Sequence, residues 1–131
     1  NINSIKDVDK EGIRIAVAER SAYDLWLTSN IKNSVLKRAK SINESFTIFE
    51  DNKYEVLAGL RPKLVDDLKN TENCNILPEA FTFINQSIGS KPGNVEAETY
   101  INNFIKNSIE NGFVKKLLLK YEVLGKLSVP K

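Results

Sequence analysis

Short runs of apolar, β-branched residues alternate with longer amphipathic segments in the first half of the chain. Apolar runs of this length, bounded by glycine, proline or charged residues, are typical of strands buried in a sheet. Four such runs predict strands, at 13–18, 35–39, 55–60 and 75–77, and the last of them stops at Pro78.

The segments between these runs have the spacing and the start signals of helices. Ser21 is a good N-cap for a helix over 22–32. Ser41 and Glu44 fit a capping box, in which the hydroxyl and the carboxylate satisfy backbone N–H groups of the first turn. Pro62 suits the first turn of a third helix, because its missing N–H is not needed there.

Residues 13–77 therefore read as β-α-β-α-β-α-β. Strands and helices that alternate with short connections predict an α/β fold, with a mostly parallel sheet, helices on both faces and right-handed crossovers. Residues 1–10, which are polar and charged, predict a loop or a short lead-in.

The rest of the chain has a different pattern. Residues 81–88 are apolar and rich in β-formers, and 89–94 predict a loop. An amphipathic helix is expected from the cap Asn94 to residue 109, ended by Gly112, and a second helix over 113–121. The tail 124–131 is expected to be extended or irregular.

Composition narrows the classes of partner. The chain has 131 residues, of which 41% are hydrophobic and 27% charged, as in an ordinary soluble domain. A net charge of +2 is too small to favour nucleic acid as a partner. We therefore expect no nucleic-acid binding.

The usual catalytic and metal-binding side chains are scarce. Histidine is absent, Cys74 is the single cysteine, and no phosphate-binding loop of the GxxxxGK[ST] type occurs. Adjacent acidic pairs such as Asp66 and Asp67 do not point at one site on a helix. The sequence thus predicts a binding protein that is not an enzyme, with no catalytic residue, no metal and no cofactor.

Ligands of open parallel sheets bind beyond the carboxyl ends of the strands, where helices begin. Helix-start amides attract anions, glycine lets a ligand approach the backbone, and arginine matches a carboxylate. The candidate ligand-binding residues are therefore those after the first and third strands: Arg20, Ser21, Ala22, Tyr23, Gly59, Leu60 and Arg61.

Simpler structural roles exist for most of these residues. Ser21 needs no ligand if it is only an N-cap. Arg20 and Arg61 could be solvated or paired with Glu19 or Glu55, and Tyr23 could pack in the core.

Four segments, in order, resemble the amino-acid type (family 3) of extracytoplasmic solute-binding proteins that serve ABC transporters. They are 8–17 (VDKEGIRIAV), 53–60 (KYEVLAGL), 87–94 (SIGSKPGN) and 111–118 (NGFVKKLL). The resemblance implies a type II periplasmic-binding-protein fold, in which two α/β lobes close over a solute and the closed form is presented to a membrane permease. Residues 1–80 would form lobe two. Residues 81–131 would form the hinge return and a C-terminal helix pair that completes lobe one, the rest of which is absent.

The chain departs from the family pattern at the site. Arg20 and Ala22 stand where the family's helix-start motif has Gly and a second Thr, and Leu60 replaces the aspartate that holds an α-ammonium group. An ammonium buried without a countercharge is costly. The departures therefore favour a small carboxylate or another anion over an ordinary α-amino acid.

The resemblance also implies partners and a location. We expect a small solute and an ABC permease as partners, and a periplasmic or extracytoplasmic location with a signal peptide upstream of Asn1 in a longer parent. A ligand-sensing domain of a sensor kinase or transcription regulator is the alternative. Without the rest of lobe one, the isolated chain is expected to self-associate through its C-terminal helices.

Overall fold

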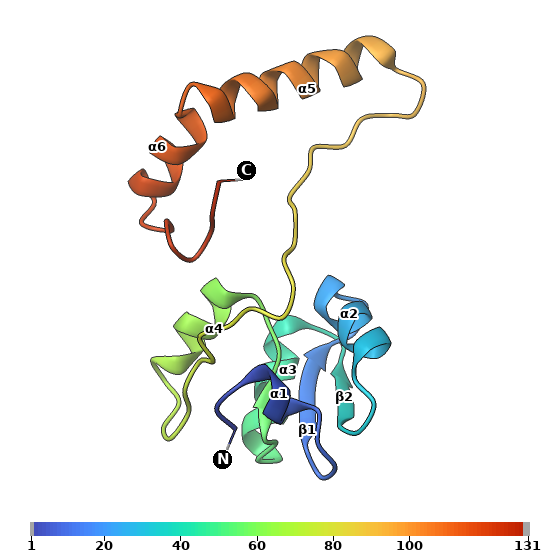
Figure 1. The fold of residues 1–131 in the computed structure, drawn as a ribbon, viewed down its shortest axis with the longest axis vertical. Helices are drawn as coiled ribbons and strands as arrows, with labels where there is room; N and C mark the ends of the chain where they lie inside the picture. Colours follow the sequence, from blue (N-terminus) through green and yellow to red (C-terminus); the bar gives the residue numbers. More distant parts are fainter. Residues whose placement is uncertain (1, 130–131) are drawn as a thin grey trace. The chain divides into compact units, whose positions relative to one another are not determined.

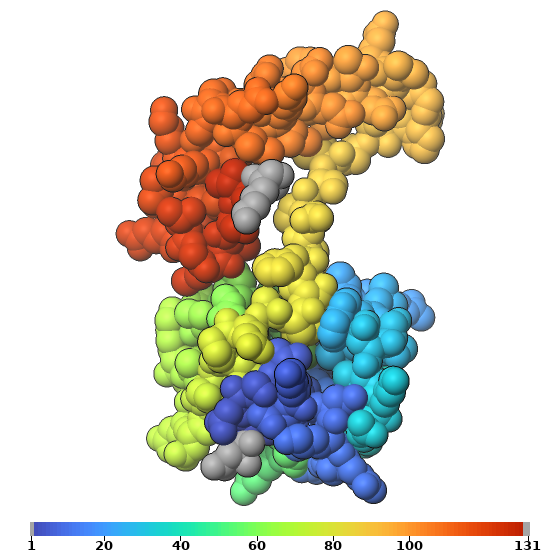
Figure 2. Space-filling model, in the orientation of Figure 1, coloured from blue at the N-terminus to red at the C-terminus, as the bar shows by residue number. Residues whose placement is uncertain are grey.

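The computed structural model describes residues 2–129 of the protein, which form two compact units (Figure 1). The first unit is Asn1–Ile84 and the second is Asn85–Lys131. Figure 2 shows the surface of each unit in the same colours along the chain.

Three parallel strands form the sheet of the first unit, in the order β2-β1-β3. Their bounds are Arg14–Ala18 for β1, Val35–Ala39 for β2 and Val56–Leu57 for β3. Arg14 faces Val35 across one pair, and Ile15 faces Val56 across the other. The prediction of an α/β fold with a parallel sheet is confirmed, although β3 is shorter than expected.

Helices connect and cover these strands. Their bounds are Ile5–Val8 for α1, Ala22–Asn30 for α2, Ile42–Asp51 for α3 and Arg61–Leu68 for α4. In the order β2-β1-β3, β2 and β3 lie on opposite sides of β1. The connection through α2, from β1 to β2, and the connection through α3, from β2 to β3, therefore run in opposite directions across the sheet. Right-handed crossovers then place α2 and α3 on opposite faces.

The core is centred on β1, because this strand has a neighbour on each side. Its residues from Ile15 to Ala18 are all buried, as expected for the central strand of a parallel sheet. The core cluster adds Val8 of α1, Tyr23 and Leu27 of α2, and Ala58, which directly follows β3. On α3, which contacts all three strands, Ser45 is buried and its hydroxyl donates to the Ile42 carbonyl at 2.8 Å.

The lead-in segment is more ordered than the sequence predicted. It contains the short helix α1, whose Val8 belongs to the core. Just after it, the Asp9 carboxylate accepts backbone N–H groups of Lys32, Asn33 and Ser34 at 2.7 to 3.1 Å. The carboxylate thereby fixes the turn that leads into β2.

The predicted strand at 75–77 is wrong, and the described part of the chain has no strand at 81–88 either. Arg61 Nη2 donates to the carbonyls of Leu77 and Pro78, at 3.1 Å each, so a guanidinium takes the place of a strand partner. Leu77 and Phe81 pack against the core, and the Phe81 ring lies 5.1 Å from that of Trp26.

The second unit contains the predicted helix pair, α5 (Val95–Glu110) and α6 (Phe113–Lys120). Asn94 caps α5, because its side-chain oxygen accepts from the Ala97 N–H at 3.0 Å. Gly112 lies between the helices with φ of +75°, in the left-handed region that favours glycine. In the tail, the Leu127 N–H donates to the Val123 carbonyl at 2.8 Å and closes a tight turn.

Candidate functional site

The two predicted binding turns lie at the same edge of the sheet. β1 and β3 are parallel neighbours, with Ala16 opposite Leu57. Continuing this register places Gly59 opposite Ala18, the last residue of β1. The structure therefore brings the segments Arg20–Tyr23 and Gly59–Arg61 to the carboxyl edge of one sheet, where α2, α3 and α4 also begin.

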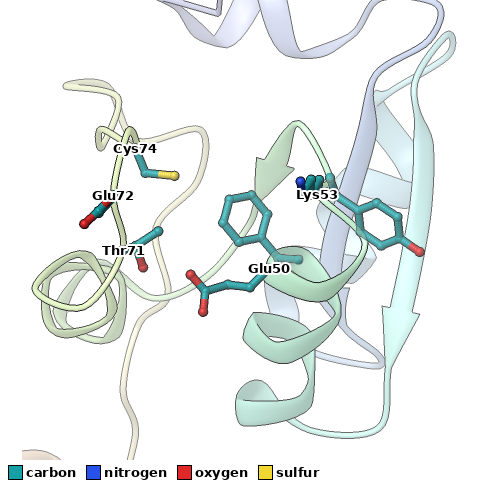
Figure 3. A pocket seen from close by; sticks show the side chains of 7 residues that line it. Glu50, Lys53, Thr71, Glu72 and Cys74 are labelled. Carbon is teal, nitrogen blue, oxygen red and sulfur yellow. The ribbon is translucent and has the colours of Figure 1, made fainter.

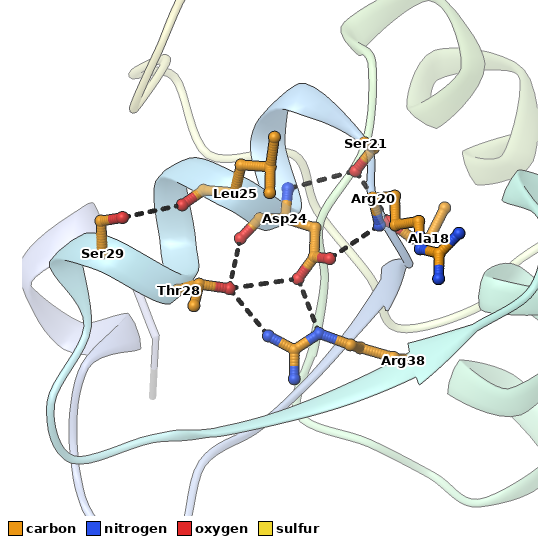
Figure 4. Close-up of polar contacts among 8 residues, drawn as sticks. All are labelled: Ala18, Arg20, Ser21, Asp24, Leu25, Thr28, Ser29 and Arg38. Carbon is orange, nitrogen blue, oxygen red and sulfur yellow. Dashed lines mark hydrogen bonds and ion pairs between the residues drawn. The ribbon is translucent and has the colours of Figure 1, made fainter.

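Ser21 acts as the N-cap of α2 (Figure 4). Its hydroxyl oxygen accepts from the Asp24 N–H at 3.1 Å, and the hydroxyl donates to the Ala18 carbonyl at 2.8 Å. The simpler role considered for Ser21 is thus present in the structure. The N–H groups of Ala22 and Tyr23 come next, and neither has a hydrogen-bond partner among the described residues.

Arg20 enters this turn with a left-handed backbone, at φ of +60°. This region is disfavoured for residues that carry a Cβ atom. The backbone N–H of Arg20 donates to Asp24 Oδ2 at 2.8 Å, which holds the turn in place. The side chain of Arg20 is exposed and forms no ion pair among residues 2–129.

Asp24 anchors a polar cluster that sequence reasoning missed. The residue is buried, and its Oδ1 accepts from Arg38 Nε of β2 at 2.9 Å. Arg38 Nη2 also donates to the Thr28 hydroxyl at 2.7 Å, and that hydroxyl donates to the Asp24 carbonyl at 2.8 Å (Figure 4). The place of Asp24 three residues after Ser21 was the available signal, because a carboxylate there reaches back to the helix start.

Tyr23 points into the core and not onto the surface. The residue is 3% exposed and belongs to the cluster that contains Ile15, Val17 and Leu27. Its hydroxyl is buried without a hydrogen-bond partner within the described part of the chain. At the carboxyl edge, Tyr23 therefore presents its backbone N–H to a ligand, and its side chain does not take part.

The second turn also has clear structural roles. A Cβ atom on Gly59 would lie 3.2 Å from Cδ2 of Leu64, so glycine lets α4 pack close to the sheet. Leu60 is the N-cap residue of α4 and contributes no side-chain cap. Arg61 holds the carbonyls of Leu77 and Pro78, as described above, and does not pair with Glu55.

Glu55 instead pairs with Arg14, at the opposite edge of the sheet. Its carboxylate accepts from Arg14 Nε at 3.0 Å and Nη2 at 2.6 Å, and from the Arg14 backbone N–H at 2.8 Å. These hydrogen bonds lower the pKa of Glu55 from 4.5 to about 2 and raise that of Arg14. The guanidinium also lies 4.9 Å from the centre of the Tyr54 ring.

Two open hollows lie at this amino edge, where the strands begin. One, of about 260 Å³, is lined by Phe49, Glu50, Lys53, Tyr54, Thr71, Glu72 and Cys74 (Figure 3). The other, of about 460 Å³, is lined by Ile2, Asn3, Ile13, Glu55, Asn73 and Asn75. Neither hollow contains a residue that the sequence predicted for the site.

Residues 2–129 contain no group of three or more His, Cys, Asp or Glu side chains placed to hold a metal ion. Within the same residues, no helix has both the length and the hydropathy needed to cross a membrane. The chain matches no protein-family model, no curated protein and no solved structure.

Proposed function

We propose that residues 2–84 are one ligand-binding lobe of an extracytoplasmic solute-binding protein that presents a small solute to an ABC permease. The protein acts as a binder and not as an enzyme. The observation that carries this proposal is the meeting of the turns after β1 and β3 at one carboxyl edge of a parallel sheet. Parallel sheets of this kind bind ligands at that edge.

The start of α2 supports the proposal in two ways. Arg20 stands where the resembled motif has glycine, and its φ of +60° is a conformation that favours glycine. The N–H groups of Ala22 and Tyr23 remain without a partner among the described residues, at the positive end of a helix dipole. This arrangement suits a carboxylate or another small anion.

The charges at this edge favour an anion over an α-amino acid. The Asp24 carboxylate is neutralised by Arg38 and therefore does not offset the positive charge of Arg20. Arg61 uses Nη2 for the carbonyls of Leu77 and Pro78. Its Nε and Nη1 have no hydrogen-bond partner within residues 2–129 and can bind a ligand. Leu60 supplies no countercharge for an ammonium group, so a solute that lacks the α-amino group binds better.

The proposal is tested by titrating ¹⁵N-labelled chain with small mono- and dicarboxylates and with the standard amino acids. One wall of a cleft binds weakly, with dissociation constants on the order of 1 mM. We expect the carboxylates to shift the amide signals of Ala22, Tyr23 and Leu60. A standard amino acid that binds more tightly than its analogue without the amino group would contradict the proposed ligand class.

Arg20 and Lys53 form a matched pair for a control. Both are exposed and have left-handed backbones, with φ of 60° and 48°, but Lys53 lies at the amino edge. Arg20→Gln should weaken carboxylate binding about threefold or more, and Lys53→Gln should leave it unchanged. If the amide signals that shift were confined to residues of the hollow beside Tyr54 and Cys74, the binding site would lie at the amino edge of the sheet, and the proposal would be overturned.

A further inference from the structure

The second unit leaves two rows of large apolar side chains exposed. On α5, Tyr100 is 73% and Phe104 49% exposed, and these residues are one helical turn apart. Phe113 and Leu117 of α6 and its C-cap residue Tyr121 follow at the same spacing and are also exposed. We call these the α5 row and the α6 row.

The unit has little core with which to hold its two helices together. Among its described residues, only Ser108 is buried. Helices with so little packing are marginal in water, and exposed apolar patches mark surfaces that are covered by a partner. The two rows therefore require an occupant.

Unpaired charges of opposite sign accompany the two rows. Glu96 lies one turn before Tyr100, at the outer end of the α5 row, and Lys116 lies one turn after Phe113, beside the first residue of the α6 row. Neither forms an ion pair within residues 2–129. Lys116 is also in the first turn of α6, which has no acidic residue, so it faces the unfavourable positive end of the helix dipole. A carboxylate from outside the unit would relieve this repulsion.

We propose that the occupant is a second copy of this chain. Two copies pair about a two-fold axis, with the α5 row of each against the α6 row of the other and with Glu96 next to Lys116 of the partner copy. In such an interface every contact occurs twice. An anionic membrane surface suits the rows less well, because it attracts Lys116 but repels Glu96.

The test is sedimentation equilibrium of the full 131-residue chain and its charge variants, without any solute. The unaltered chain should form a dimer in the micromolar range. Lys116→Glu and Glu96→Lys should each raise the dimer dissociation constant about tenfold, because two symmetry-related pairs become repulsive. Combining both substitutions should restore the constant to within about threefold of the original, because the pairs are attractive again.

Lys115→Glu is the matched control. It makes the same charge change in the same turn, but it lies about 160° around the helix from Phe113 and Leu117, away from the α6 row. It should leave dimerisation unchanged. Lys116→Glu also places a carboxylate at the start of α6, where it favours the helix, so circular dichroism should show no loss of helicity that could explain a weaker dimer.

Three outcomes would overturn the proposal. One is a monomer at all accessible concentrations, and another is an equal effect of Lys115→Glu and Lys116→Glu. The third is open-ended association that the double variant does not reverse. A monomer that binds vesicles containing phosphatidylserine, and loses this binding with Lys116→Glu, would assign the rows to a membrane surface instead.

Discussion

The carboxylate of Asp24 accepts a hydrogen bond from Nε of Arg38 at 2.9 Å, and this bond ties α2 to β2 beside the candidate site (Figure 4). The carboxylate is almost fully buried, whereas the guanidinium remains partly in solvent. A buried charge that loses its partner is costly, and a partly exposed one is less so. Removing Arg38 and removing Asp24 should therefore change the free energy of unfolding by different amounts.

Arg38→Gln should lower the free energy of unfolding by about 2 kcal/mol, because it leaves the Asp24 carboxylate buried with less compensation. Urea denaturation measures the change. Lys37→Gln, at the neighbouring position of β2 and outside any ion pair in residues 2–129, is the control and should have little effect. Adding Asp24→Asn to Arg38→Gln should recover part of the loss, and no recovery would show that the two residues are not coupled.

Phe81 should anchor the segment that leaves the first unit, through its contact with Trp26. Phe81→Ala should lower the free energy of unfolding by about 1–2 kcal/mol, because it removes a partly buried ring from the edge of the core. Trp26 is the single tryptophan, so its fluorescence should shift to longer wavelength as water reaches it. Phe83→Ala is the control, since Phe83 is 83% exposed, and equal effects of the two substitutions would contradict this role of Phe81.

Gly59 should be required for packing as well as for any ligand. Gly59→Ala places a Cβ atom 3.2 Å from Cδ2 of Leu64, so the leucine must shift, at a cost of about 1 kcal/mol. Shortening the neighbour with Leu64→Val should reduce this cost in the double variant. Gly89→Ala should change the unfolding midpoint little, because no atom of the described residues beyond its chain neighbours lies within 4 Å of the added group. If Gly59→Ala left the free energy of unfolding unchanged, the close contact between residue 59 and Leu64 would be refuted.

Local signals were enough to predict most of the fold. The caps Ser21, Ser41 and Asn94 each begin a helix as expected, because a cap and the helix that it starts are adjacent in sequence. The parallel sheet followed from the alternation of strands and helices. The strand predicted at 75–77 is absent, and there the Leu77 carbonyl accepts a hydrogen bond from Arg61, sixteen residues away, a contact that the local pattern does not reveal.

The side-chain contacts at the site were harder to predict. The Asp24–Arg38 bond spans 14 residues, and the bonds of Asp9 to residues 32–34 span 23 to 25. No pattern of helical or strand spacing encodes such pairs. They arise only when tertiary packing brings the segments together, as does the burial of Tyr23 in the core.

The stability of the protein should fall in acid, and Asp9 should account for part of the loss. Hydrogen bonds from the N–H of Asn33, and also from Ser34 and Lys32, hold the pKa of Asp9 below its ordinary value in the folded state. Glu55 behaves in the same way, with a pKa lowered from 4.5 to about 2 by Arg14. The unfolded chain therefore binds more protons as the pH falls. The stabilisation is present above the ordinary pKa values and is lost as the pH drops towards the folded ones.

Urea midpoints between pH 6 and pH 2 measure this loss. Asp9→Asn should lower the midpoint at pH 6, because the amide oxygen is a weaker acceptor for the three N–H groups than a carboxylate. The urea midpoint of the variant should also change less with pH than that of the unaltered chain, since one of the titrating groups is gone. Glu11→Gln removes a nearby exposed carboxylate that accepts no hydrogen bond from the described residues, and it should keep the original slope. If Asp9→Asn kept that slope as well, the turn at residues 32–34 would not depend on the charge of Asp9, and the acid sensitivity would have to come from Glu55 and other carboxylates.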